Sequence, residues 1–194
     1  MLARRVAGVG ILERGSGRPF TLFAPGGRGA HLDRRMRYAD KVPGTKVGFA
    51  YEASRHFEAI RRIRRQADRD ASEARAVAID CEATQAIGFS RGARAVIGAL
   101  AEDPALFERV VLVMPPGGQA AGKYSTWLAS LTSTGRDGLT AEILVVGQRG
   151  DQGHPARVAE VWSERLGARL EILPPRAIQI DSGRAASLLA EFLS

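Results

Sequence analysis

From Lys46 onward, short apolar runs alternate with longer amphipathic segments, and this alternation limits the folds that the chain can adopt. The run at 109–114 is apolar at almost every position, whereas a half-buried strand would be apolar only at every second one. Strands that are buried on both sides and separated by helices favour a mostly parallel sheet covered on both faces. We therefore expect an α/β fold.

The same patterns predict the individual elements. We expect about seven strands, at 6–12, 20–24, 46–50, 85–89, 109–114, 142–146 and 169–173. We expect helices at 31–39, 55–66, 72–81, 91–101, 124–131, 155–166 and 184–193. The first two strands are predicted to form an antiparallel hairpin through residues 15–17. The 194 residues show no repeat and no low-complexity linker, so a single domain over 1–194 without a separate lid is expected.

Composition excludes several classes of protein. Cys81 is the only cysteine, and no Cys/His cluster has metal-ligand spacing, so neither a disulfide framework nor a metal site is expected. No stretch approaches the roughly 20 apolar residues of a membrane span, and the N-terminal residues lack the apolar core of a signal peptide. We expect a soluble cytoplasmic protein that does not bind membranes.

The sharpest local motif is Gly88-Phe89-Ser90-Arg91-Gly92, at the junction of a predicted strand and a predicted helix. A serine lifted from a strand end on such a turn is a nucleophile elbow, and the small residues on either side relieve crowding of the backbone. A strand-to-helix loop that needs glycine only for packing is the alternative interpretation.

With this motif the chain resembles the α/β-hydrolase superfamily over nearly its whole length. The resemblance implies a serine hydrolase that acts on an ester, thioester or lactone through Ser90 and needs no cofactor. It implies an oxyanion hole in the glycine-containing loop after an early strand, for which we nominate Gly27 together with the N–H of Arg91. It also implies a triad acid in the loop after a late strand, where Asp151 stands. Capping of the helix predicted near Pro155 is the other role open to Asp151.

The histidine is the point at which the pattern departs from the family. Relatives carry it after the last strand, but residues 174–183 contain none, and the chain has 3 histidines in all: His31, His56 and His154. His154 is the favoured base because it shares a loop with Asp151. His31 follows the proposed oxyanion loop and is the second candidate base and a candidate substrate contact. His56, on a helix face, is expected to be structural. Without a base the serine is a weak nucleophile, so a degenerate protein that only binds a small molecule or a protein partner stays the alternative.

Some residues are candidates for substrate binding. Tyr51 and Glu52 follow the strand at 46–50, where loops of the family line the pocket. Arg91 could bind a substrate carboxylate or phosphate, or form a salt bridge instead. Lys and Arg number 28 against 21 for Asp and Glu, which suits a small anionic substrate.

Two other functions fit the sequence less well. The segment Gly117-Gly118-Gln119-Ala120-Ala121-Gly122-Lys123-Tyr124 resembles a phosphate-binding loop, but Tyr124 stands where the Mg²⁺-binding Ser or Thr is required. The arginines at 61–65 could contact nucleic acid, but no nucleic-acid-binding motif accompanies them and aromatic residues make up only 6% of the chain. Neither nucleotide hydrolysis nor nucleic-acid binding is therefore the favoured function.

Overall fold

Strands and helices alternate along most of the chain, as the apolar runs predict. The structure is a computed structural model that describes residues 4–6, 8–27, 32–51, 61–117, 139–180 and 182–194. The strands in these ranges are β1 (Arg4–Val6), β2 (Val9–Gly15), β3 (Phe20–Ala24), β4 (Thr45–Ala50), β5 (Gln85–Phe89), β6 (Arg109–Val113), β7 (Glu142–Gln148) and β8 (Arg169–Leu173). The run expected as one strand at 6–12 is thus divided between β1 and β2.

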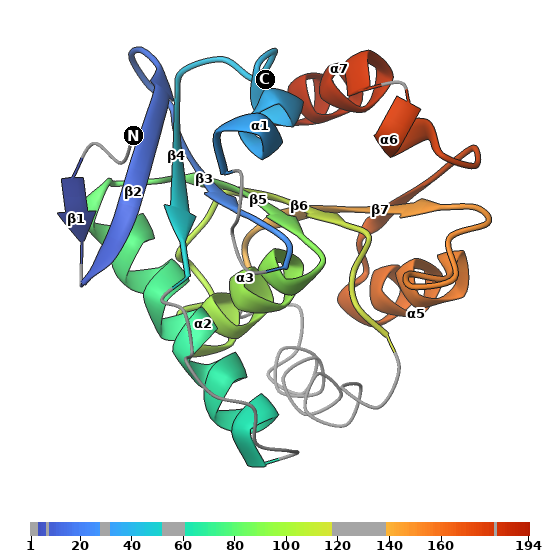
Figure 1. The fold of residues 1–194 in the computed structure, drawn as a ribbon, viewed down its shortest axis with the longest axis horizontal. Helices are drawn as coiled ribbons and strands as arrows, with labels where there is room; N and C mark the ends of the chain where they lie inside the picture. The colour runs from blue at the N-terminus through green and yellow to red at the C-terminus, as the bar shows by residue number, and fades with distance from the viewer. Residues whose placement is uncertain (1–3, 7, 28–31, 52–60, 118–138, 181) are drawn as a thin grey trace.

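The strands form one sheet in the order β1-β2-β4-β3-β5-β6-β7-β8 (Figure 1). All neighbours from β4 to β8 are parallel, and β1 and β2 form an antiparallel edge. The predicted hairpin between the first two strands is wrong, because β2 pairs with β4, which lies between β2 and β3. The more exposed β2 lies one strand from the sheet edge, which β1 forms, whereas β3 is covered almost throughout and lies between β4 and β5.

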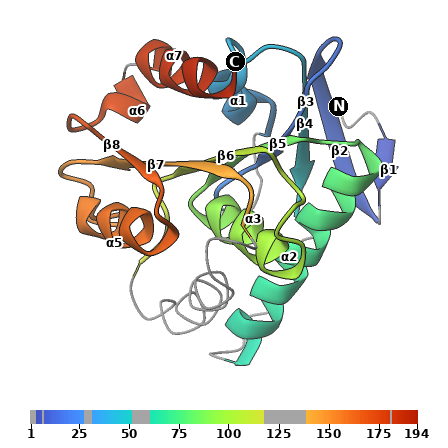
Figure 2. The same cartoon turned by 180° about the vertical axis from the view of Figure 1, so that it is seen from behind.

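Helices cover both faces of the sheet. The helices are α1 (Leu32–Met36), the 3₁₀ turn η1 (Arg37–Ala39), α2 (Arg61–Asp80), α3 (Arg91–Glu102), α5 (Ala156–Leu166), α6 (Ala177–Ile180) and α7 (Ser182–Leu193). Figures 1 and 2 show α2, α3 and α5 on one face, and α1, α6 and α7 on the other.

Two of the predicted helices are parts of one longer helix in the structure. The segments expected at 55–66 and 72–81 contribute to a single 20-residue helix, α2. Ala67 and Ala71 lie at its centre, are buried, and are strong helix formers, so nothing interrupts the helix there. The helix predicted at 124–131 lies outside the described residues.

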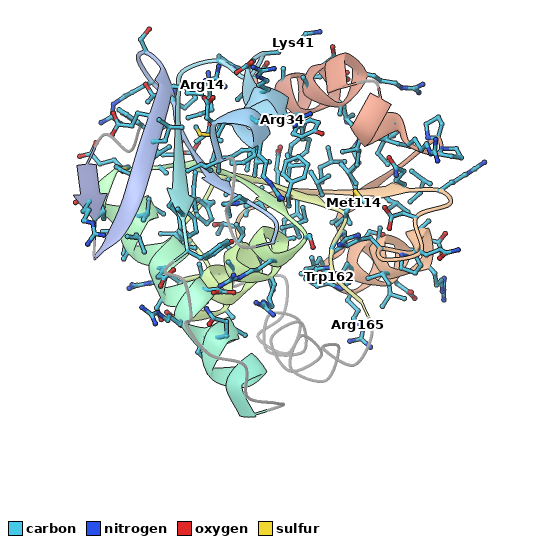
Figure 3. All side chains as sticks on the ribbon, in the orientation of Figure 1. Arg14, Arg34, Lys41, Met114, Trp162 and Arg165 are labelled. Atoms are coloured by element: carbon cyan, nitrogen blue, oxygen red, sulfur yellow. The ribbon has the colours of Figure 1, made fainter. Side chains whose placement is uncertain are left out.

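Alternate side chains of the central strands supply two hydrophobic cores. In β6, Val110 and Leu112 pack into the core beneath α3 and α5, and Val111 and Val113 pack into the core beneath α1 and α7. Figure 3 shows Trp162 of α5, which belongs to the first core, below the sheet in that view. Coverage on both faces explains why these strands are apolar at almost every position.

Candidate active site

Ser90 lies on a strained turn between β5 and α3. Its backbone has φ 49° and ψ −108°, a conformation that non-glycine residues rarely adopt. A Cβ on Gly88 would stand 2.6 Å from the Cα of Ala93, and one on Gly92 would stand 1.9 Å from the carbonyl oxygen of Ala24. Both contacts involve backbone atoms, so this turn requires glycine at both positions. The geometry is that of a nucleophile elbow.

The Ser90 hydroxyl contacts a histidine. Its Oγ lies 2.8 Å from Nε2 of His154, in a partly buried contact. On the other side of the imidazole ring, Nδ1 of His154 lies 3.4 Å from Oδ1 of Asp151. The same carboxylate oxygen accepts the backbone N–H of His154 at 2.7 Å. Ser90, His154 and Asp151 therefore form a continuous chain of polar contacts.

His154 and Asp151 both belong to the loop between β7 and α5. The residue before α5 is Pro155, and no side chain caps this helix. Asp151 instead tethers its own loop through the N–H of His154, so the capping interpretation of Asp151 is wrong. The segment 174–176 after β8, where the family carries its histidine, is Pro-Pro-Arg.

The oxyanion-hole candidates lie next to Ser90. A Cβ on Gly26 would stand 3.4 Å from Cβ of Ser90, so the loop after β3 packs against the elbow. The N–H of Ser90 donates to the carbonyl of Val113 at 2.9 Å and is not free to bind an oxyanion. Arg91 is the first residue of α3, and an N–H at that position has no acceptor within its own helix. These contacts leave the N–H groups of Gly27 and Arg91 as the candidate donors.

The Arg91 side chain is bound to a buried carboxylate. Asp70 of α2 is fully buried, and it accepts hydrogen bonds from Arg91 Nε at 2.7 Å and Nη2 at 2.5 Å. Arg94 Nη2 donates to the same carboxylate at 2.6 Å, and Gln66 Nε2 donates at 2.8 Å. Of the two roles considered for the Arg91 guanidinium, the structure shows the salt bridge.

Tyr51 is buried beneath that arginine. Its exposed fraction is 4%, and the Arg91 guanidinium carbon lies 4.1 Å from the centre of its ring. Burial raises the pKa of the Tyr51 hydroxyl well above its usual range. The structure therefore packs Tyr51 behind the elbow and does not present it to a substrate. His31, Glu52, His56 and the residues 118–124 lie outside the described residues.

The arrangement of the described residues also bears on metal binding and on membrane crossing. Among them, no group of three or more His, Cys, Asp or Glu side chains is arranged to hold a metal ion. No helix of the described chain has both the length and the apolar character that crossing a membrane demands.

Solved structures share the fold of this protein over almost the whole chain. A protein described as a predicted CIB-like hydrolase from Thermoplasma acidophilum superimposes with a TM-score of 0.72 at 16% identity, over 97% of this chain and 94% of its own. A serine hydrolase from Cycloclasticus zankles gives a TM-score of 0.70 at 14% identity, over 97% and 95%. An esterase from Pyrococcus furiosus gives 0.66 at 17% identity, over 96% and 87%.

The chain has the α/β-hydrolase fold. No protein-family model matches the sequence, and no curated protein does either. In the α/β-hydrolase fold of this chain, Ser90 and the Asp151–His154 loop both lie at the carboxyl ends of parallel strands, β5 and β7. Ligands of open α/β sheets bind at that edge.

Proposed function

We propose that the protein is a serine hydrolase that cleaves an ester, thioester or lactone by acyl transfer through Ser90. The observation that carries the proposal is the 2.8 Å contact between Ser90 Oγ and His154 Nε2, on a strained turn at the carboxyl end of β5. A hydroxyl becomes an effective nucleophile when a base lies within hydrogen-bond reach. The hydrolases and the esterase that share the fold agree with this chemistry.

The geometry supports the usual two-step reaction. As Ser90 Oγ attacks the substrate carbonyl carbon, its proton passes to Nε2 of His154, and the carbonyl oxygen becomes an oxyanion held by the N–H groups of Gly27 and Arg91. The proton then passes to the leaving alcohol, thiol or ring oxygen as its bond to carbon breaks. Water then attacks the acyl-enzyme and gives one proton to His154, which returns it to Ser90 Oγ as the bond from Oγ to the acyl carbon breaks and the acid is released.

Asp151 has two tasks in this scheme. Its hydrogen bond to the N–H of His154 fixes the loop, and its charge, 3.4 Å from Nδ1, stabilises the imidazolium that forms during proton transfer. In this scheme the acid and the base lie three residues apart in one loop, whereas in the family they come from two separate loops.

The substrate is proposed to be a small molecule. The net charge of +7 fits an anionic one, although the Arg91 guanidinium is already occupied by Asp70. A reducing cytoplasm is the proposed compartment, because Cys81 has no second cysteine to pair with.

A panel of p-nitrophenyl esters, acyl thioesters and lactones tests the proposal. We expect hydrolysis of at least one class by the native chain, a burst of product as the acyl-enzyme accumulates, and loss of both in Ser90→Ala. His154→Ala is expected to lower kcat by at least about 10³-fold. Turnover that survives in Ser90→Ala would overturn the proposal. A folded native chain with no turnover would favour the degenerate, binding-only alternative.

A further inference from the structure

Arg35, on α1, reaches the oxyanion loop from the side opposite α3. Its Nη1 donates to the carbonyl oxygen of Gly26 at 2.7 Å in a partly buried hydrogen bond. The position of a Cβ on Gly26 would be 3.2 Å from this Nη1 and 3.4 Å from Cβ of Ser90. The guanidinium and the nucleophile therefore flank the same glycine.

The hydrogen bond from Arg35 fixes the direction of the next N–H. A peptide unit is planar and almost always trans, so the carbonyl of Gly26 and the N–H of Gly27 point in opposite directions from one rigid plane. Holding the Gly26 carbonyl towards Arg35 therefore directs the Gly27 N–H away from Arg35. Gly27 has φ +61°, and glycine adopts many backbone conformations, so this segment needs contacts from outside to keep one orientation.

A second arginine holds the next carbonyl. Arg91 Nη1 lies 3.2 Å from the carbonyl oxygen of Gly27. The rest of this guanidinium is fixed by Asp70 and by the Tyr51 ring, so it forms a rigid donor. Two consecutive carbonyls of the loop are thus held by arginines from two different helices.

We propose that Arg35 and Arg91 are positioning residues that hold the Gly26–Gly27 backbone so that the Gly27 N–H faces the developing oxyanion. The inference rests on the proposed function, since it assigns a role within that reaction. Neither side chain touches the reacting atoms; both act through the loop. Arg35 is the sharper test, because Arg91 also neutralises the buried Asp70 and its loss would disturb the fold.

The contacts of Arg35 suit this role. Within the described part of the chain, its guanidinium donates to the Gly26 carbonyl, and no carboxylate pairs with it. Its neighbour Arg34, labelled in Figure 3, lies on the same helix and is exposed, and its side chain donates to no group in the described part of the chain. Arg34→Met therefore serves as a matched control that removes an arginine from α1 without touching the loop.

The test compares the native chain, Arg35→Met, Arg35→Lys and Arg34→Met on the ester that the native chain hydrolyses best. We expect Arg35→Met to lower kcat by about 10- to 100-fold, with KM changed less than about twofold, because an oxyanion donor acts in the transition state. Affinity for a trifluoromethyl ketone, which forms a tetrahedral oxyanion on serine, is expected to fall by a similar factor. Arg35→Lys, which keeps one donor, should restore much of both, and Arg34→Met should match the native chain.

Two results would overturn the inference. One is an Arg35→Met variant that keeps the native kcat and the native affinity for the ketone. If Ser90→Ala is inactive in the same assay, this result overturns the role of Arg35 but leaves the proposed function intact. The other is a crystal structure of Arg35→Met in which the Gly26–Gly27 peptide keeps its orientation, and this readout needs no activity. A reoriented peptide is the expected result.

Discussion

Nε2 of His154 lies 2.8 Å from Oγ of Ser90, although 64 residues separate them in the sequence. The sheet makes this contact possible because β6 is the only strand between β5, which carries Ser90, and β7, which carries the histidine loop. The backbone of Ser90 is itself tied to β6 through the Val113 carbonyl. A histidine from the loop after β7 can thus reach Ser90, although the loop after the last strand contains none.

Asp151→Asn separates the charge of the carboxylate from its structural role. The asparagine Oδ1 can still accept the N–H of His154, so the loop is expected to keep its shape, but the negative charge near Nδ1 is lost. We expect kcat to fall by about 10²- to 10⁴-fold, but less than in His154→Ala, and the melting temperature to change little. Steady-state kinetics check this, with Asp151→Ala, which also removes the tether, as the more severe variant. Native activity in Asp151→Asn would show that the charge has no role.

Replacement of Ser90 should reveal the strain in the elbow. The backbone of Ser90 has φ 49° and ψ −108°. In this conformation a residue with a Cβ is strained, whereas glycine is not. We expect Ser90→Gly to be more stable than Ser90→Ala by about 1 kcal/mol, with both inactive. Urea unfolding of the two variants measures the difference. Equal free energies of unfolding would mean that the elbow stores no such strain.

Asp70→Asn should be strongly destabilising. The carboxylate is fully buried and is the counter-charge of both Arg91 and Arg94. Removing one member of a buried ion pair leaves uncompensated charge and costs about 3–5 kcal/mol. Asp103→Asn is the matched control, since Asp103 pairs with Arg75 at 3.5 Å in a half-exposed bridge whose loss should cost less than about 1 kcal/mol. Similar unfolding free energies for the two variants would contradict this account of the Asp70 cluster.

The stability of the chain should depend on pH through Glu73. Burial raises the pKa of the Glu73 carboxyl above its ordinary value, although Arg69, which donates to its Oε1 at 2.9 Å, opposes this. The folded state therefore holds the Glu73 proton to a higher pH than the unfolded state does, and the free energy of unfolding falls as pH rises through that window. Glu73→Gln removes the effect, so this variant should gain stability relative to the native chain between about pH 4 and pH 7. A difference in unfolding free energy that stays constant over this range would refute the prediction.

Patterns local in the sequence predicted the parallel core and the elbow. The strand at 85–89, the glycines at 88 and 92 and the helix after Ser90 depend on neighbouring residues, and the structure contains them where expected. The pairing of β2 with β4 was missed, because apolar runs show which segments are strands and not which strands are adjacent.

The polar contacts between residues far apart in the sequence could not be predicted from sequence patterns. Asp70 lies within a polar stretch of α2, and nothing near it in the sequence indicates that it meets Arg91, 21 residues away. Arg35 is one of many arginines, and its contact with Gly26 depends on how α1 packs against β4. The ion pairs and hydrogen bonds that these arginines make near Ser90 therefore depend on the fold and not on neighbouring residues in the sequence.

Reaction with a fluorophosphonate tests most directly whether Ser90 and His154 form a working nucleophile and base. The reagent forms a covalent bond to an activated serine, and intact-mass and peptide mass spectrometry report the extent and position of labelling. We predict one label per chain, located at Ser90, absent in Ser90→Ala and slowed at least about 10³-fold in His154→Ala. A folded native chain that takes up no label, or a His154→Ala variant labelled at the native rate, would contradict the account.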